Sequence, residues 1–170
     1  MSAQDKEDRP GNLLAEAVRL REEERLEEAR EHLLALAARF PDNAEVAYCT
    51  AGVHDVLGLE SEAVPFYESC LSGTGLSDED RRGALLGLGS TYRVLGQYTR
   101  AVDTLRLGVL QYPDDGGLQT FLAMALFNTG DHHEAMQILL RLLATTSQDP
   151  YVQQYRRSIE QYSKDLNETM

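Results

Sequence analysis

The sequence predicts an all-α protein made of four consecutive helix hairpins and a final helix, on three observations. First, residues 84–113 hold two apolar stripes of helical period, separated by Gly96 and followed by Pro113. This order indicates a helix, a tight turn, a second helix and a stop. Second, the pattern recurs, since four alanines follow one another at steps of 34, 38 and 34: Ala29, Ala63, Ala101 and Ala135. Third, a hairpin cannot bury both stripes alone, so the hairpins must stack.

Composition excludes several classes of function. The 170 residues fit one domain with a net charge of −12, which would repel nucleic acid. Arginines within residues 19–30 alternate with glutamates, so we expect them to pair along the helix. No run approaches the roughly 18 apolar residues of a membrane span, so we expect no membrane contact and a cytoplasmic location. Cys49 and Cys70 form no paired-cysteine motif and should stay reduced there.

The N-terminal region begins with a polar tail. Residues 1–9 lack the apolar core of a signal peptide, and we expect them to be disordered. The first hairpin then spans about residues 10–43 and ends at Phe40-Pro41. Glu24 occupies the turn position that glycine holds in the other hairpins. The core stripes of its two helices are Leu13, Ala17 and Leu20, then Ala29, Leu33 and Leu36.

The second hairpin spans about residues 44–77. Its core positions are Ala47, Ala51 and His54 in the first helix and Ala63, Tyr67, Cys70 and Leu71 in the second. Residues 72–76 form a flexible loop, and Ser77 precedes two acids as an N-cap would. The middle step between the alanines is longer than the other two by four positions, which lengthen either this loop or the start of the next helix.

The third hairpin spans about residues 82–115 and the fourth about 116–149. The second-helix stripes are Ala101, Leu105, Leu107 and Val109 in the third hairpin and Ala135, Leu139 and Leu142 in the fourth. Residues 150–166 then predict one amphipathic helix that caps the stack, with residues 167–170 as a tail. Its apolar face comprises Tyr151, Val152, Tyr155, Ile159, Tyr162 and Leu166.

The chain resembles the tetratricopeptide repeat family over residues 10–166, because that family repeats with a period of about 34 residues. The third hairpin matches the family signature best, at Leu85, Leu88-Gly89, Tyr92, Gly96, Tyr98, Ala101, Leu105, Gly108 and Pro113. Small residues suit positions where adjacent helices approach closely. The departures are the absence of Trp, Gly108 in place of the last Ala, and no Pro after the second hairpin.

The resemblance implies a right-handed superhelix whose concave face, lined by the first helix of each hairpin, binds peptides or helices of other proteins. The positions that match this face are unusually apolar, and the basic residues with which some members clamp a carboxylate are missing. The resemblance therefore implies a set of partner-binding residues for this chain: Leu14, Val18, Tyr48, Leu86, Ser90, Arg93, Phe121, Met124, Phe127 and Asn128.

Three explanations of the apolar face stay open. It receives an apolar or amphipathic segment of an unknown protein, it is filled by a second copy in a homodimer, or it packs internally. Gly83 and Gly87, one turn apart on this face, fit either the close approach of a partner backbone or a crowded buried spot. We predict the first arrangement, a scaffold or adaptor module, with the self-associating structural protein as the alternative.

Catalysis has little support in the sequence. There is no nucleophile elbow, phosphate loop, HExxH or paired-cysteine motif, so we expect no enzyme activity and no cofactor. His132 and His133 have only Glu134 near them as a further ligand, which indicates surface turn residues rather than a metal site. His54 takes a core position usually held by Tyr, so we expect a buried, hydrogen-bonded histidine.

Overall fold

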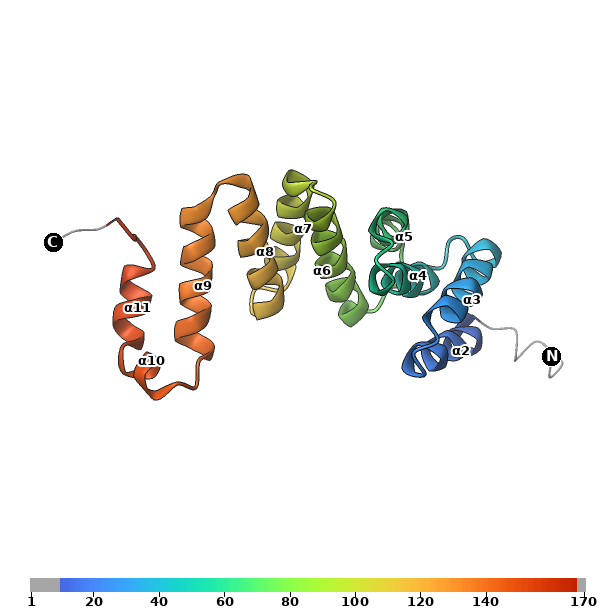
Figure 1. Ribbon diagram of the computed structural model, residues 1–170, viewed down its shortest axis with the longest axis horizontal. Coiled ribbons are helices and arrows are strands. Elements are labelled where there is room, and N and C mark those ends of the chain that lie inside the picture. The colour runs from blue at the N-terminus through green and yellow to red at the C-terminus, as the bar shows by residue number, and fades with distance from the viewer. Residues whose placement is uncertain (1–9, 168–170) are drawn as a thin grey trace.

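The computed structural model describes residues 10–167, and within that range it contains ten α-helices and no strand. Eight of them form four hairpins placed side by side, so that the two ends of the chain lie at opposite ends of an elongated molecule (Figure 1). The predicted all-α solenoid is confirmed. The predicted disorder of residues 1–9 and the end of the predicted tail, residues 168–170, fall outside the described range.

Each hairpin pairs two consecutive helices. The first and second hairpins are formed by α2 (Pro10–Glu22) with α3 (Leu26–Arg39) and by α4 (Ala44–Val56) with α5 (Glu60–Ser72). The third and fourth are formed by α6 (Asp78–Val94) with α7 (Tyr98–Gln111) and by α8 (Gly116–Thr129) with α9 (His132–Thr146). Two short helices follow, α10 (Pro150–Gln154) and α11 (Arg156–Tyr162).

All four hairpins turn in the same way. Gly58, Gly96 and Gly130 have φ of 72°, 73° and 91°, and Glu24 takes the same left-handed conformation with φ of 60°. A backbone N–H bonds to the carbonyl five residues earlier in every hairpin, from Arg25 to Leu20 at 2.9 Å in the first, as in a Schellman cap. The turn that lacks glycine therefore lies where the sequence predicts it.

Glu24→Gly should stabilise the protein. A side chain in the left-handed region costs roughly 1–2 kcal/mol, which glycine removes. Part of this gain in stability is offset, because glycine also makes the unfolded chain more flexible. We expect a net gain of about 0.5 kcal/mol in the free energy of unfolding, measured by urea denaturation. Glu22→Gly, at the last residue of α2, is the matched control and should lose up to about 1 kcal/mol. An equal loss in both variants would contradict the prediction.

The four extra positions of the third hairpin lengthen its first helix. α6 has 17 residues, whereas α4 has 13 residues and α8 has 14 residues. Counted back from the turn glycine, α6 begins one helical turn earlier than α4 and α8 do. Ser77 caps α6, since its hydroxyl accepts from the Asp80 N–H at 3.0 Å. The predicted N-cap is confirmed, and the alternative of a longer loop is excluded.

The start of α6 bonds to both neighbouring hairpins. Arg81, the last residue of the added turn, donates to the Leu71 carbonyl at 3.2 Å, near the end of α5. Arg82, the next residue, forms an ion pair of 2.6 Å with Asp115, the N-cap of α8. The start of α6 therefore joins the second, third and fourth hairpins.

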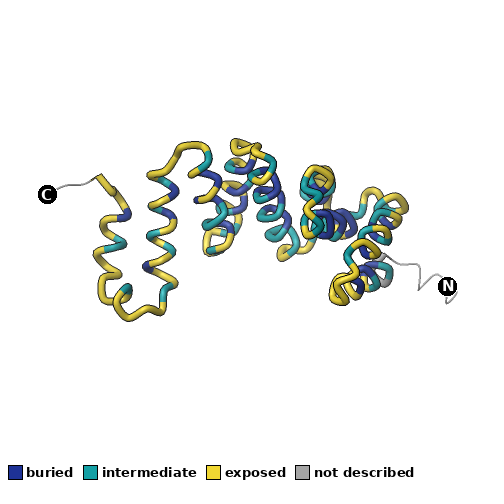
Figure 2. Tube along the Cα trace, viewed as in Figure 1, coloured by how far each residue is buried: buried dark blue, intermediate teal, exposed yellow. Residues whose placement is uncertain are grey.

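The core runs between the helices of the four hairpins, and each of these helices turns its buried side toward its neighbours (Figure 2). Ala29, Ala63, Ala101 and Ala135 are all buried, with at most 4% of their surface exposed. The predicted repeat register is confirmed by this common burial. His54 is buried as predicted, with Nδ1 2.7 Å from the Thr50 carbonyl oxygen.

Gly83 and Gly87 receive side chains of this chain, and not a partner backbone. A Cβ on Gly83 would meet the phenol end of Tyr48 from α4, with the ring carbon Cζ at 3.2 Å. A Cβ on Gly87 would lie 2.6 Å from Cζ of Tyr67 from α5. Of the two explanations left open by the sequence, the crowded site within the fold is therefore correct.

The core stripes of the second helices differ in part from the prediction. Leu107 is exposed at 43%, because it lies about 200° around the helix from the fully buried Leu105. Leu139 is exposed at 40%, and Ile138 is the buried residue of α9 at this level. The prediction that Leu105 and Leu107 share one core stripe is therefore wrong.

The predicted capping helix is also wrong as a single helix. It breaks at Tyr155, whose φ and ψ of −101° and 8° separate α10 from α11. The Tyr155 N–H bonds to the Val152 carbonyl at 3.1 Å, a three-residue step instead of the four-residue step of an α-helix. Tyr151, Tyr155 and Tyr162 remain 57–74% exposed, so these three side chains do not shield the core.

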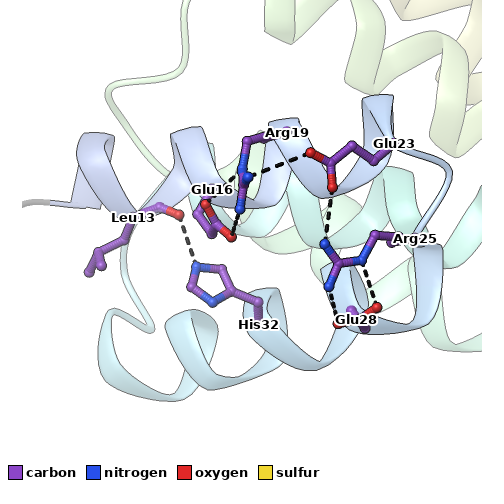
Figure 3. Close-up of polar contacts among 7 residues, drawn as sticks. All are labelled: Leu13, Glu16, Arg19, Glu23, Arg25, Glu28 and His32. Carbon is purple, nitrogen blue, oxygen red and sulfur yellow. Dashed lines mark hydrogen bonds and ion pairs between the residues drawn. The ribbon is translucent and has the colours of Figure 1, made fainter.

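Arg19 and Arg25 of the first hairpin form the predicted pairs with glutamates (Figure 3), whereas Arg30 lies 3.7 Å from Glu62 of the next hairpin. Arg19 lies 2.6 Å from Glu16 and 3.5 Å from Glu23. Arg25 lies 3.0 Å from Glu23 and 2.6 Å from Glu28, so that Glu23 links the two arginines. Hydrogen bonds from the guanidinium groups lower the pKa of Glu16 and of Glu28. Arg19 and Arg25 are therefore engaged along their own hairpin.

Candidate functional site

The partner-binding residues predicted from the sequence all lie on the first helices of the hairpins. α2 contacts α4, α4 contacts α6, and α6 contacts α8, so these helices form one continuous row. We call the side of this row that carries the predicted residues the inner face. The ten residues are Leu14, Val18, Tyr48, Leu86, Ser90, Arg93, Phe121, Met124, Phe127 and Asn128.

The ten residues differ widely in accessibility. Val18, Met124 and Phe127 are exposed at 44%, 41% and 63%. Six are half-buried: Tyr48, Leu86, Ser90, Arg93, Phe121 and Asn128. Leu14 is 4% exposed and belongs to the core cluster that also contains Val46 of α4, so it cannot contact a partner. Its inclusion in the predicted site is corrected.

The α8 end of the inner face is the most apolar part. Met124 and Phe127 lie three residues apart and are therefore neighbours on one side of the helix. The Phe127 ring packs on the His132 ring with 4.7 Å between centroids, which fixes the aromatic side chain at the α8–α9 turn. Phe121 and Leu86 pack against the core beneath. An exposed apolar surface with a fixed aromatic ring is typical of contact sites.

Two polar atoms beside this apolar surface have no hydrogen-bond partner. They are Nε of Arg93, near the end of α6, and Oδ1 of Asn128, near the end of α8, and both atoms are buried. An unpaired buried polar atom costs about 1–3 kcal/mol, so nearly all such atoms in proteins are paired. Because both atoms are inaccessible from outside, they mark an unpaired polar spot within the packing and are not themselves contacts for a partner.

A half-buried carboxylate joins three helices at the centre of the row. Tyr67 of α5 donates to Oδ2 of Asp55 of α4 at 2.7 Å, and Thr91 of α6 donates to Oδ1 of Asp55 at 2.9 Å. Burial raises the pKa of Asp55, although the two hydrogen bonds oppose the shift. No sequence pattern predicts this cluster, because its members lie far apart along the chain and only the fold brings them together.

Small residues occupy the middle of the inner face. Gly52 of α4 and Ser90 of α6 hold the register position that Val18 and Met124 hold at the two ends, six residues before the turn position. No atom lies within 4 Å of the place where a Cβ on Gly52 would stand. The face therefore has open space at its centre and larger apolar groups toward its ends.

Two clefts lie away from this centre. One of about 340 Å³ lies between the first two hairpins and is lined by Val18, Arg21, Glu22, Leu26 and Val56. Another of about 870 Å³ lies between α7 and α9, with Leu122, Ile138 and Leu142 among its lining residues. None of the ten predicted residues lines the second cleft, so it is separate from the candidate site.

Reactive groups are not prominent in the described part of the chain. Burial raises the pKa of the Cys49 and Cys70 thiols to about 11, which keeps both protonated at neutral pH. Residues 10–167 contain no group of three or more His, Cys, Asp or Glu side chains arranged to hold a metal ion. Over the same residues, no helix is both long and apolar enough to cross a membrane.

A row of stacked hairpins with a common turn and a common alanine position defines a helical-repeat solenoid. A family model described as Tetratrico peptide repeat matches residues 44–166, and one described as Tetratricopeptide repeat matches residues 14–73. The chain therefore belongs to the tetratricopeptide repeat family. No curated protein matches the sequence.

Solved structures share the fold at low sequence identity. MamA from Desulfovibrio magneticus RS-1 is 17% identical, with a TM-score of 0.71 over 90% of this chain and 84% of that chain. YrrB, described as a TPR protein with an unusual peptide-binding site, is 18% identical, with a TM-score of 0.66 over 93% of this chain and 89% of that chain. At these identities the likeness establishes the shared fold.

Proposed function

We propose that this protein is a non-catalytic interaction module that binds a segment of another protein along its inner face. The observation that carries the proposal is the exposed apolar pair Met124 and Phe127, three residues apart at the α8 end of the inner face. The peptide-binding site in the description of YrrB, which shares the fold, supports the same class of ligand. The module acts in the cytoplasm, where its two free cysteines would stay reduced.

The partner segment has two kinds of contact with this face. Apolar side chains of the segment cover Met124 and Phe127, which supplies most of the affinity. Polar groups of the segment contact the accessible parts of Arg93 and Asn128, which are half-buried near the ends of α6 and α8. Because the chain carries a net charge of −12, basic residues in the segment would speed association.

The test uses a displayed library of random dodecapeptides. Peptides are selected on the wild-type protein, and their affinities are measured by fluorescence anisotropy. Met124→Asp combined with Phe127→Asp should weaken binding at least tenfold, because both side chains are exposed and form the apolar end of the face. Phe121 is not replaced, because it packs against the core and its loss would disturb the fold.

Leu110→Asp is the matched control. Leu110 is 79% exposed on α7, outside the inner face, and its replacement should leave peptide affinity unchanged. Circular dichroism of each variant establishes that the helices remain. Peptides that bind the double variant as tightly as the wild type would refute the proposal. Loss of a wild-type dimer in the double variant, without any peptide selected, would favour self-association through this face.

A further inference from the structure

The last hairpin presents an apolar stripe on its second helix. Met136, Leu139 and Leu143 of α9 are exposed at 49%, 40% and 44%. They lie three and four residues apart, so they share one face of the helix. We call these three residues the α9 stripe.

The central position of this stripe is covered in every other hairpin. Counted from the turn position, Leu139 corresponds to Leu33, Tyr67 and Leu105, which are exposed at only 0%, 4% and 0%. The covering element is the first helix of the next hairpin, as α3 contacts α4, α5 contacts α6, and α7 contacts α8. The α9 stripe is thus a repeat interface with its covering helix missing.

The end of the chain does not supply that cover. α10 and α11 follow the fourth hairpin and pack beside α9 (Figure 1). Gln137 of α9 donates to the Lys164 carbonyl at 2.7 Å, and Ala144, seven residues further along α9, is fully buried. At about 100° per residue, Gln137 and Ala144 lie roughly opposite Leu139. α11 therefore contacts the opposite side of α9 from the stripe.

A second exposed apolar surface lies on the segment after α9, over residues 151–166. Tyr151, Tyr155 and Tyr162 are exposed at 74%, 58% and 57%, and Leu166 at 37%. We call these four residues the tyrosine face. The chain therefore carries both an uncovered repeat interface and an apolar surface suited to cover one, but the two are not joined within one copy.

We infer that the C-terminal end of the solenoid is a self-association surface. In a two-fold dimer, the tyrosine face of each copy covers the α9 stripe of the other. Such an isologous contact satisfies all four surfaces at once and leaves no open end from which a fibre could grow. The inner face takes no part in it, so the dimer and the proposed peptide ligand can coexist.

Charge favours a second copy as the occupant. Residues 1–130 carry 22 Asp or Glu against 12 Lys or Arg, whereas residues 131–167 carry five against four. Two copies can therefore approach through their C-terminal ends without the repulsion that the rest of the chain would cause. The three tyrosines and the α9 stripe together offer roughly 1,000 Å² over both copies, near the lower limit for a specific dimer.

The first test measures mass by light scattering on a sizing column, with the full chain from about 1 to 200 μM. We expect wild type to shift with concentration from 19.0 kDa toward twice that mass. Leu139→Asp, at an exposed position, should weaken dimerisation at least tenfold and leave the circular dichroism unchanged. Leu110→Asp, exposed on α7 outside both surfaces, should dimerise like wild type. A wild type that stays monomeric at the highest concentration would overturn the inference.

The second test identifies the surfaces. Leu143→Cys and Tyr155→Cys are made in separate copies, mixed in equal amounts and oxidised. We expect a covalent dimer that joins one copy of each kind, and much less of it when Leu110→Cys replaces Leu143→Cys.

A single chain that carries both cysteines tests the alternative. If it forms a cross-link only within the molecule, its own α10–α11 segment covers the stripe. A dimer that persists in Leu139→Asp but dissociates in the Met124 and Phe127 double variant would place the contact on the inner face. Either result contradicts the inference.

Discussion

Gly89→Ala should lower the free energy of unfolding by about 1 kcal/mol, because it would overpack the core. Gly89 is buried in α6, and a Cβ there would lie 2.7 Å from Cδ2 of Leu105, closer than carbon atoms approach. Leu105 is fully buried in the core and cannot move aside without displacing its neighbours. Overpacking of this kind typically costs about 1–3 kcal/mol, and the roughly 1 kcal/mol that alanine gains over glycine within a helix offsets part of that cost.

Gly52→Ala is the matched control, because the same substitution should have the opposite sign. Gly52 also lies inside a helix, α4, but no atom lies within 4 Å of its added Cβ. The intrinsic preference for alanine then acts alone and should raise stability by about 1 kcal/mol. Urea unfolding followed by circular dichroism measures both variants. Equal effects of the two substitutions would show that close packing of α6 on α7 is not what requires Gly89.

Asp55→Ala should lower the free energy of unfolding by about 2 kcal/mol, because it would leave a buried donor without a partner. Thr91 keeps an acceptor, since its hydroxyl also lies 2.8 Å from the Gly87 carbonyl oxygen. Tyr67 loses the only acceptor that the structure gives its hydroxyl, in a site where the ring is 4% exposed. Such an unpaired donor costs about 1–3 kcal/mol. Thermal or urea unfolding of the variant gives the value.

Asp55→Asn separates the hydrogen bonds from the charge. The amide oxygen can still accept from Tyr67, so the loss at neutral pH should be below about 1 kcal/mol. Burial raises the pKa of Asp55 in the folded protein above its unfolded value. The folded state then holds this proton more tightly, so the contribution of Asp55 to stability falls as the pH rises from the unfolded pKa through the folded one.

The pH dependence gives a direct test of that sign. Wild type should gain stability relative to Asp55→Asn as the pH is lowered through the raised folded pKa toward about 3.9, where the unfolded carboxyl titrates. Above the folded pKa the difference between the two proteins should be constant. A relative loss of wild-type stability on acidification would mean that the hydrogen bonds from Tyr67 and Thr91 outweigh the cost of burial.

The repeat architecture was predictable because its causes are local. The alanines at the common register position and the turn glycines each act through their own backbone or their nearest neighbours. Glu24 was placed at a turn by register alone, and the structure gives it the left-handed φ of 60° that the other turns share. The Ser77 cap was predictable for the same reason, since its hydrogen bond reaches only to Asp80.

Other features depend on contacts that a periodic pattern does not contain. Leu14 occupies the register position of Tyr48 and Leu86, which are half-buried, yet it is covered within the cluster that includes Val46. The tyrosines of the last segment keep helical spacing through Tyr155, so spacing alone cannot reveal the break there. Helical spacing also does not reveal which side chains fill the space beside Gly83 and Gly87. Those side chains are tyrosines of the preceding hairpin.

The bonds made by the start of α6 should govern how the stack comes apart. In a repeat protein, each hairpin is held mainly by its two neighbours, so unfolding starts where the coupling between neighbours is weakest. Arg81 and Arg82 couple the third hairpin to both sides, through Leu71 and Asp115. The rod should therefore fray from its two ends inward. In hydrogen exchange, the amides of α6 should be the last to take up deuterium.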